Sequence, residues 1–179
     1  ASNPLNEERI PGSVGLPLPM ETLRIVNDQN QEVNHNEVGH IQVKGDNVFT
    51  GYWRNKAKTI ESFTKDGYFK TGDIGIINDN NYVYIVGRSK DMVITGGINV
   101  YPKEIEDLIN KTHGVKESAI IGLPHLDFGE AVTAVIVCAE NIELNGDILS
   151  KQLKDNLANY KVPKKIIFVG SLPRNSMGK

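Results

Sequence analysis

The sequence predicts an α+β fold in which a β-rich first half is followed by a small α+β domain. In the first half, short apolar or alternating runs such as 22–26 and 39–45 are separated by turn residues, which is typical of strands. In the second half, a helical pattern beginning at Pro102 is followed by two strand-like runs, another helical pattern and a last strand. The polar segment 87–91 separates the two patterns. We therefore expect a domain boundary in that segment.

The first half is expected to contain one short helix and a β-meander. Residues 55–63 suit a helix with Ala57, Ile60 and Phe63 on one side. The turn residues 79–81 lie between two apolar runs, which predicts a hairpin. The segment 67–87 is therefore predicted to be a meander of antiparallel strands.

Both helices of the second half have recognisable starts. Proline suits the first helical position because its missing N–H would lack a partner there, and Pro102 precedes a run with one apolar face. Asn145 is expected to cap a helix over 146–158, in which three leucines recur at intervals of four residues.

Composition restricts the classes of function. The formal net charge of −2 lacks the basic excess of a nucleic-acid-binding face. No apolar run reaches the ~18 residues of a membrane span, and the first residues lack the basic-then-apolar order of a signal peptide. The single cysteine, Cys138, excludes an internal disulfide, so a cytoplasmic location is the default expectation. The histidines and Cys138 are not spaced as metal ligands, so no metal site is expected in this chain.

Two polar clusters follow predicted strands. Asp73 ends a Lys-Thr-Gly-Asp run, where a carboxylate can accept hydrogen bonds from two neighbouring hydroxyls, such as those of a ribose. Arg88 offers a planar fork for phosphate or ribose oxygens, and Lys90 adds a point charge. Each cluster alone also fits a structural role, as a turn aspartate bonded to its own backbone or as a solvated linker with weak ion pairs.

A glycine pair and the last lysine are further candidates. Gly96 and Gly97 permit positive φ and close approach of a ligand before a helix, but lack the spacing of the common phosphate-binding motifs. Lys179 follows a glycine and could neutralise charge on a reacting phosphate. Read alone, that stretch fits a frayed basic terminus equally well.

Taken together and in order, these clusters resemble the adenylate-forming superfamily, which holds acyl-CoA synthetases, luciferases and peptide-synthetase adenylation domains. Four runs carry the resemblance over nearly the whole chain: GHIQVKGDNVFTGYW, DGYFKTGDIG, YIVGRSKDMVITGGINVYPKEIE and YKVPKKIIFVGSLPRNSMGK. The segments GGINVYPKEIE, LPHLDFGEAV and LPRNSMGK look most like the malonyl-CoA synthetase and fatty-acid–CoA ligase branch, with a lean towards malonate.

The resemblance implies an acid–thiol ligase that works in two steps. A small carboxylic acid would react with ATP and Mg²⁺ to give an acyl-adenylate and pyrophosphate, and coenzyme A would then displace AMP. Asp73 resembles the carboxylate that holds both ribose hydroxyls, and Arg88 resembles the arginine that contacts ribose and phosphate. Lys179 matches the catalytic lysine of adenylation.

The same resemblance implies a mobile lid. Lys90 stands at the hinge position, and Gly96, Gly97 and Ile98 match the loop that lines the pantetheine channel in the second step. One rigid site cannot present both this loop and the catalytic lysine, so a lid would have to move between the steps.

The resemblance also implies how the chain divides. Residues 1–88 would be the distal, β-rich part of the large N-terminal adenylation domain, and residues 89–179 would be the C-terminal lid. The ATP-phosphate loop, the Mg²⁺ ligands and most of the acyl pocket belong to a region absent from this chain. The chain is therefore expected to be a fragment that is inactive alone.

Two alternatives remain beside a CoA ligase. One is an adenylation domain that loads a carrier protein. The other is a non-catalytic module that kept the fold. The sequence leaves the acyl substrate and the oligomeric state open.

Overall fold

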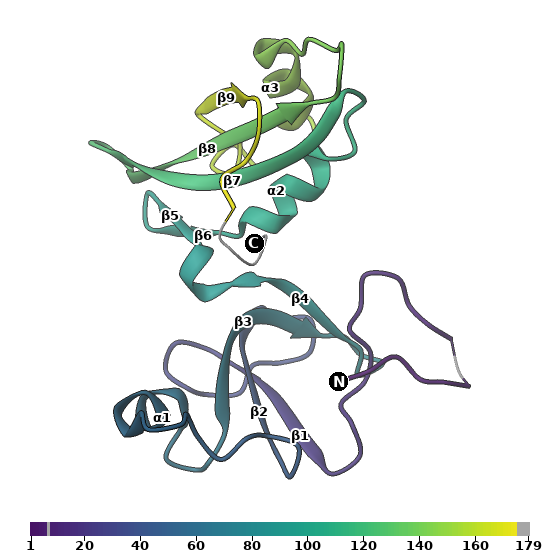
Figure 1. Ribbon diagram of the computed structural model, residues 1–179, viewed down its shortest axis with the longest axis vertical. Coiled ribbons are helices and arrows are strands. Elements are labelled where there is room, and N and C mark those ends of the chain that lie inside the picture. The colour runs from purple at the N-terminus through teal and green to yellow at the C-terminus, as the bar shows by residue number, and fades with distance from the viewer. Residues whose placement is uncertain (7, 175–179) are drawn as a thin grey trace. The chain divides into compact units, whose positions relative to one another are not determined.

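A computed structural model of the chain describes residues 1–6 and 8–174. The chain divides into two units, Ala1–Lys90 and Asp91–Lys179. Each unit has its own sheet (Figure 1). None of the helices in the described part is both long and apolar enough to cross a bilayer.

The first unit is built on a four-stranded antiparallel meander in the order β1-β2-β3-β4, with one helix in the connection between β2 and β3. The elements are β1 (Glu21–Val26), β2 (Gly39–Gly45), α1 (Lys56–Ser62), β3 (Phe69–Ile77) and β4 (Val83–Arg88). Its core is small and is centred on the buried side chains of Ile25, Ile41 and Val83.

The β3–β4 hairpin confirms the prediction made from the turn residues 79–81. Asn78 Oδ1 accepts hydrogen bonds from the backbone N–H groups of Asn80 and Tyr82, at 3.1 and 2.9 Å. Asn81 adopts the left-handed conformation, with φ of 63°, which asparagine tolerates better than most residues. The local chemistry of asparagine therefore closes the turn.

The short helix α1 also forms as predicted. The Oδ1 atom of Asn55 accepts from the N–H of Lys58 at 3.0 Å, which satisfies one donor at the helix N-terminus. The expected apolar side is only partly used. Phe63 packs edge-on with Phe49, with ring centroids 5.7 Å apart, whereas 67% of Ile60 is exposed.

The second unit has a five-stranded sheet in which the central strand β8 pairs with β7 along one edge and with β5 and β9 along the other. The elements are β5 (Val93–Thr95), β6 (Ile98–Val100), α2 (Pro102–Ile109), β7 (Val115–His125), β8 (Gly129–Cys138), α3 (Gly146–Lys154) and β9 (Lys165–Val169). Strand β9 is parallel to β8, and the other ladders are antiparallel.

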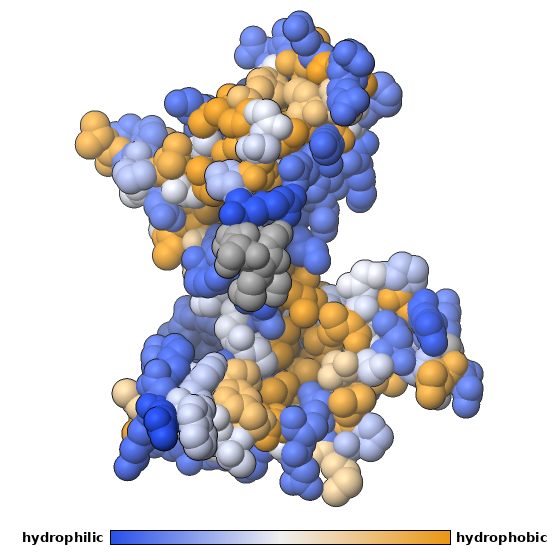
Figure 2. Space-filling model, in the orientation of Figure 1, coloured by the Kyte–Doolittle hydropathy of each residue, from blue (hydrophilic) through white to orange (hydrophobic). Residues whose placement is uncertain are grey.

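Helices α2 and α3 contribute to one core. Ile105 and Ile109 of α2 and Leu149 and Leu153 of α3 are buried among the apolar side chains of the sheet. Figure 2 shows that hydrophilic residues make up much of the visible surface of this unit, interrupted by apolar ones. The α+β fold class is thus confirmed.

Helix α3 ends four residues earlier than predicted. Asn145 caps it as expected, because its side chain accepts from the N–H groups of the first turn. After Lys154 the backbone tightens, because the N–H of Asn156 donates to the carbonyl of Leu153, three residues back, at 3.1 Å. The side-chain amide of Asn156 donates to the carbonyl of Gln152 at 2.9 Å. Leu157 nevertheless remains buried beyond the helix end.

Candidate functional site

A bulge in β3 determines where Asp73 points. The ladder between β2 and β3 is regular on both sides of Ile41, but opposite this one residue β3 carries three, Thr71, Gly72 and Asp73. Gly72 has φ of 79°, a conformation that favours glycine. Such an insertion breaks the alternation of side chains along the strand and re-aims the residues that follow it.

The hydroxyl of Thr71 closes this bulge. It donates to the carbonyl oxygen of Ile41 at 3.0 Å and accepts from the N–H of Asp73 at 3.0 Å. The Thr71 side chain therefore satisfies the carbonyl of Ile41 at the point where the ladder is interrupted, and it also fixes the backbone of Asp73. The Thr-Gly-Asp order is a recognisable signal for such a turn, because threonine hydroxyls bond to the backbone two residues on.

Asp73 and Arg88 face each other across β3 and β4. They are register partners, and Arg88 Nε lies 3.0 Å from Asp73 Oδ1. The carboxylate side chain is 22% exposed and the guanidinium side chain 59% exposed. The structure thus brings these two predicted residues together at the end of the β3–β4 ladder, although Asp73 lies within β3 and not at the strand end where the sequence predicts it. They form a half-sheltered acceptor beside an accessible cation.

A pocket of about 770 Å³ lies next to this pair in the first unit. Its lining includes Gly72 and Ser89, which are the chain neighbours of Asp73 and Arg88. The loop after β1, the residues around α1, the first half of β2 and Lys70 of β3 form the rest of the wall. Asp73 and Arg88 are not lining residues themselves, so the pair adjoins, through its chain neighbours, a hollow large enough for a small ligand.

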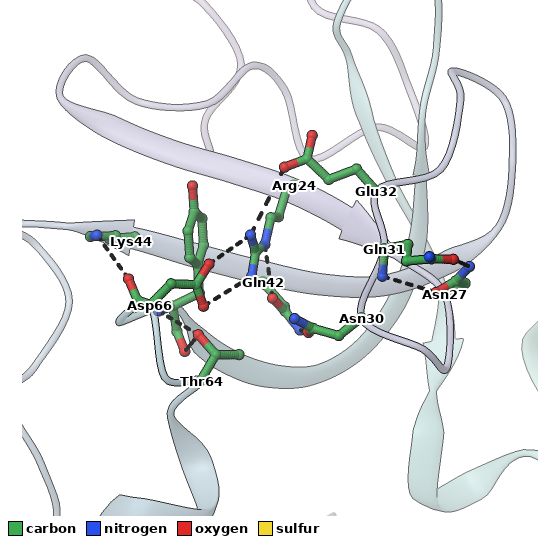
Figure 3. Close-up of polar contacts among 10 residues, drawn as sticks. Arg24, Asn27, Asn30, Gln31, Glu32, Gln42, Lys44, Thr64 and Asp66 are labelled. Carbon is green, nitrogen blue, oxygen red and sulfur yellow. Dashed lines mark hydrogen bonds and ion pairs between the residues drawn. The ribbon is translucent and has the colours of Figure 1, made fainter.

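A polar network that the sequence did not reveal holds one wall of this pocket (Figure 3). The buried side chain of Gln42 accepts from Arg24 Nε at 2.9 Å and donates to Asn30 Oδ1 at 2.7 Å. Arg24 also forms an ion pair with Asp66 at 2.9 Å. The hydroxyl of Thr64 and the guanidinium of Arg24 hold the pKa of Asp66 below its usual range. The network ties the loop after β1 to the turn before β3.

The predicted hinge lies at the boundary between the two units. Lys90 is exposed within a short 3₁₀ turn, η1 (Ser89–Asp91), and the first unit ends at this residue. The predicted domain boundary after residue 88 falls two residues earlier.

The glycine pair forms the turn of a hairpin that the sequence did not predict. Gly96 and Gly97, with φ of 57° and 78°, connect the paired residues Thr95 and Ile98 of β5 and β6. Two residues with positive φ suit the tight turn that matches strand twist. A Cβ atom added at Gly97 would meet no atom within 4 Å, and Ile98 is exposed. The turn therefore presents an open backbone edge.

Lys179, the predicted catalytic lysine, lies outside the described residues. The last described residue, Arg174, forms an ion pair with Glu117 of β7. Among the described residues, no three histidine, cysteine, aspartate or glutamate side chains gather as metal ligands do.

Comparisons with known proteins agree with this architecture. The model of the AMP-binding enzyme C-terminal domain matches residues 104–179, and the AMP-binding enzyme model matches residues 1–53. Among curated proteins, the chain is 41% identical to a malonate–CoA ligase of Arabidopsis thaliana and 40% identical to a long-chain-fatty-acid–CoA ligase of Salmonella typhimurium. Each alignment covers 99% of the chain but 31% of the relative, so the chain spans about a third of the length of these proteins.

Solved structures give the same result. ATP-bound MatB from Rhodopseudomonas palustris matches 98% of the chain at 50% identity with a TM-score of 0.93, over 35% of its own length. MenE from Bacillus subtilis, in complex with an acyl-adenylate intermediate, matches 94% of the chain at 33% identity with a TM-score of 0.87, over 34% of its length. The chain therefore belongs to the AMP-binding, adenylate-forming enzymes, and it corresponds to their C-terminal part.

Proposed function

We propose that the chain is part of an ATP-dependent acyl-CoA synthetase, an acid–thiol ligase. The observation that carries the proposal is the Asp73–Arg88 pair, a carboxylate and a guanidinium 3.0 Å apart beside a pocket, in a chain of the AMP-binding family. A family match indicates the class of chemistry, and the geometry of these residues suits a nucleotide.

In the first half-reaction, a carboxylate attacks the α-phosphate of ATP and pyrophosphate leaves. A carboxylate has about four lone-pair sites, so Asp73 can keep Arg88 on Oδ1 and still accept both ribose hydroxyls. Arg88 is largely exposed and presents further N–H donors to ribose and phosphate oxygens. Lys179 would supply the cation that offsets the repulsion between the two reacting anions.

In the second half-reaction, the thiol of coenzyme A attacks the acyl carbon and AMP leaves. We assign the lining of the pantetheine path to Gly96, Gly97 and Ile98. The open space around Gly97 and the exposed apolar side chain of Ile98 support this assignment, since a thin chain needs room and an apolar wall. Lys90 is the proposed hinge, with residues 1–88 as part of the adenylation domain and 89–179 as the lid.

The proposal includes a substrate class and a setting. Malonate is the first acid to test. The chain is 50% identical to MatB and 41% identical to the Arabidopsis malonate–CoA ligase, compared with 40% for the Salmonella fatty-acid ligase. Mg²⁺ would be held by residues outside this chain. A cytoplasmic location fits the lone free thiol of Cys138.

The test is carboxylate-dependent ATP–pyrophosphate exchange by the full-length enzyme, followed by thioester formation with coenzyme A. Asp73→Ala should weaken ATP binding and slow exchange, whereas Asp46→Ala, which changes an exposed aspartate after β2, should leave both unchanged. Exchange without a CoA thioester would favour a carrier-protein acceptor. Absence of exchange with every acid would favour a non-catalytic module.

A further inference from the structure

Strand β5 is fastened to the sheet of its unit by very few backbone contacts. Its ladder with β8 contains a single register pair, Thr95 with Gly129. Beside that pair, the N–H of Gly96 donates to the carbonyl of Phe128 at 2.8 Å. The buried side chains of Val93 and Thr95 also hold the strand, but between them the exposed Ile94 lacks such packing, so the backbone there would depend on any additional bond.

Glu130 of β8 supplies such a bond. Its Oε2 atom accepts from the backbone N–H of Ile94 in β5 at 2.7 Å. Because Thr95 and Ile98 are the residues that flank the two-residue turn, the N–H of Ile94 points away from β6 and needs a partner elsewhere. The carboxylate therefore takes the place that a ladder carbonyl would fill.

The sheet leaves a space for this carboxylate. Gly122 of β7 lies beneath it, and a Cβ atom added there would come within 2.9 Å of Glu130 Cδ and Oε2 and 3.0 Å of Oε1. Gly122 has no left-handed backbone that would explain a glycine. The missing side chain is instead explained by the close approach of Glu130.

We propose that Glu130 is a positioning residue for the second half-reaction, acting through β5 on the Gly96–Gly97 turn. We call the bond between Glu130 and the N–H of Ile94 the latch. The role in catalysis rests on the proposed function, whereas the latch itself does not. Removing the carboxylate would free the N–H of Ile94 and let β5 open locally. The glycine turn would then sample more positions, and the thiol path that it lines would be less well defined.

Amide hydrogen exchange in the 179-residue chain tests the latch without any activity. A hydrogen bond to a charged group stabilises by enough that Glu130→Ala should lower the protection of the Ile94 amide by roughly 10- to 100-fold. Glu130→Gln keeps an acceptor oxygen and should retain most of the protection. Glu140→Ala, which changes an exposed glutamate just after β8, should have no effect.

A second variant tests the same contact from the other side. Gly122→Ala should displace the carboxylate and lower Ile94 protection in the same direction. Because both changes break one contact, Gly122→Ala combined with Glu130→Ala should add little to Glu130→Ala alone. Additive effects, or unchanged protection in Glu130→Ala, would overturn the latch.

Half-reactions of the full-length enzyme test the role in catalysis. Glu130→Ala should slow transfer from a supplied acyl-adenylate to coenzyme A about tenfold, and change ATP–pyrophosphate exchange less than about twofold, as a loosened loop predicts. Glu130→Gln should restore transfer. Lost protection with equal loss in both half-reactions would overturn the positioning role. An unaltered full-length enzyme that catalyses neither half-reaction would overturn the proposed function. The amide hydrogen exchange of Ile94 would still decide whether Glu130 holds β5.

Discussion

The hydroxyl of Thr71 donates to the carbonyl oxygen of Ile41 at 3.0 Å, across the point where the β2–β3 ladder is interrupted. The same oxygen accepts the N–H of Asp73. The side chain of Thr71 therefore sets the shape of the bulge that carries Asp73, the residue proposed to bind the ribose.

Thr71→Val should lower the free energy of unfolding of the first unit and weaken ATP binding. Valine has nearly the same shape but leaves the carbonyl of Ile41 and the N–H of Asp73 without this partner, at a cost of about 1–3 kcal/mol. Thr71→Ser retains the hydroxyl and is the matched control. Denaturant unfolding of the 179-residue chain and the KM for ATP in the full-length enzyme measure the two effects. Equal behaviour of the valine and serine variants would contradict this role.

Gly97→Leu should slow thioester formation much more than Gly97→Ala does. Both variants place an L-residue at φ of 78°, so both incur the same backbone strain of about 1–2 kcal/mol. They differ only in side-chain size, and a Cβ atom at this position meets no atom within 4 Å in the chain itself. A leucine variant that is slower than the alanine variant in acyl transfer but equal to it in adenylate formation would therefore report a ligand passing the turn. Identical rates of transfer would remove Gly97 from the proposed thiol path.

Elements closed by local chemistry could be predicted from the sequence. The hairpin at Asn78–Tyr82 and the cap at Asn145 depend on asparagine side chains that bond to nearby backbone, and such contacts are encoded within a few residues. Strands β5 and β6 were missed, because three residues are too few to show a periodicity. The sequence predicts their Gly-Gly connection as a ligand loop and not as a hairpin turn.

The candidate site could be predicted in part, because some of its features are encoded in short stretches of the sequence. Asp73 and Arg88 were expected at the ends of strands in one meander, and the structure makes them register partners. The Thr-Gly-Asp order signals a local turn at Thr71, but the bulge itself depends on how β3 aligns with β2, 30 residues away in the sequence, and the sequence does not show that alignment. The Glu130–Ile94 contact joins two strands that the sequence pattern did not connect.

Lys90→Pro should impair one half-reaction more than the other. Proline fixes φ near −65° and restricts the residue before it, so a rotation about this position would be limited. Lys90→Ala removes the charge but leaves the backbone free, and it should keep both half-reactions close to the normal rate. Adenylate formation and thioester formation are measured separately in the full-length enzyme. Equal effects of the proline change on both steps would argue against a hinge at Lys90.

Glu106→Gln should stabilise the second unit at neutral pH. Burial raises the pKa of Glu106, the N–H of Ile120 bonds to its Oε1 atom and lowers it, and the charges of Asp107 and Asp91 raise it further. A raised pKa means that the native state favours the protonated form, so stability from this group is full at low pH and lost as the pH rises through the native pKa.

The glutamine variant keeps an acceptor for Ile120 without the charge, so its advantage should shrink as the pH falls through the raised native pKa of Glu106 and be smallest below the ordinary pKa of a glutamate. Denaturant unfolding of the 179-residue chain at several pH values measures this difference. Glu140→Gln, an exposed glutamate after β8, should show no comparable trend. An advantage that grows towards low pH would reverse the assigned direction.

Lys179→Ala should nearly abolish adenylation in the full-length enzyme and spare thioester formation. The attack of a carboxylate on a phosphate brings two anions together, and a preorganised ammonium group offsets their repulsion only in that step. Loss of one such contact typically costs on the order of 100- to 1,000-fold in rate, about 3–4 kcal/mol. Transfer from supplied acyl-adenylate to coenzyme A involves no attack on phosphate, so its rate should stay near normal. Lys165→Ala, which changes an exposed lysine of β9, is the matched control. A Lys179→Ala enzyme that catalyses ATP–pyrophosphate exchange normally would remove Lys179 from the first half-reaction and leave its chemistry to a cation elsewhere.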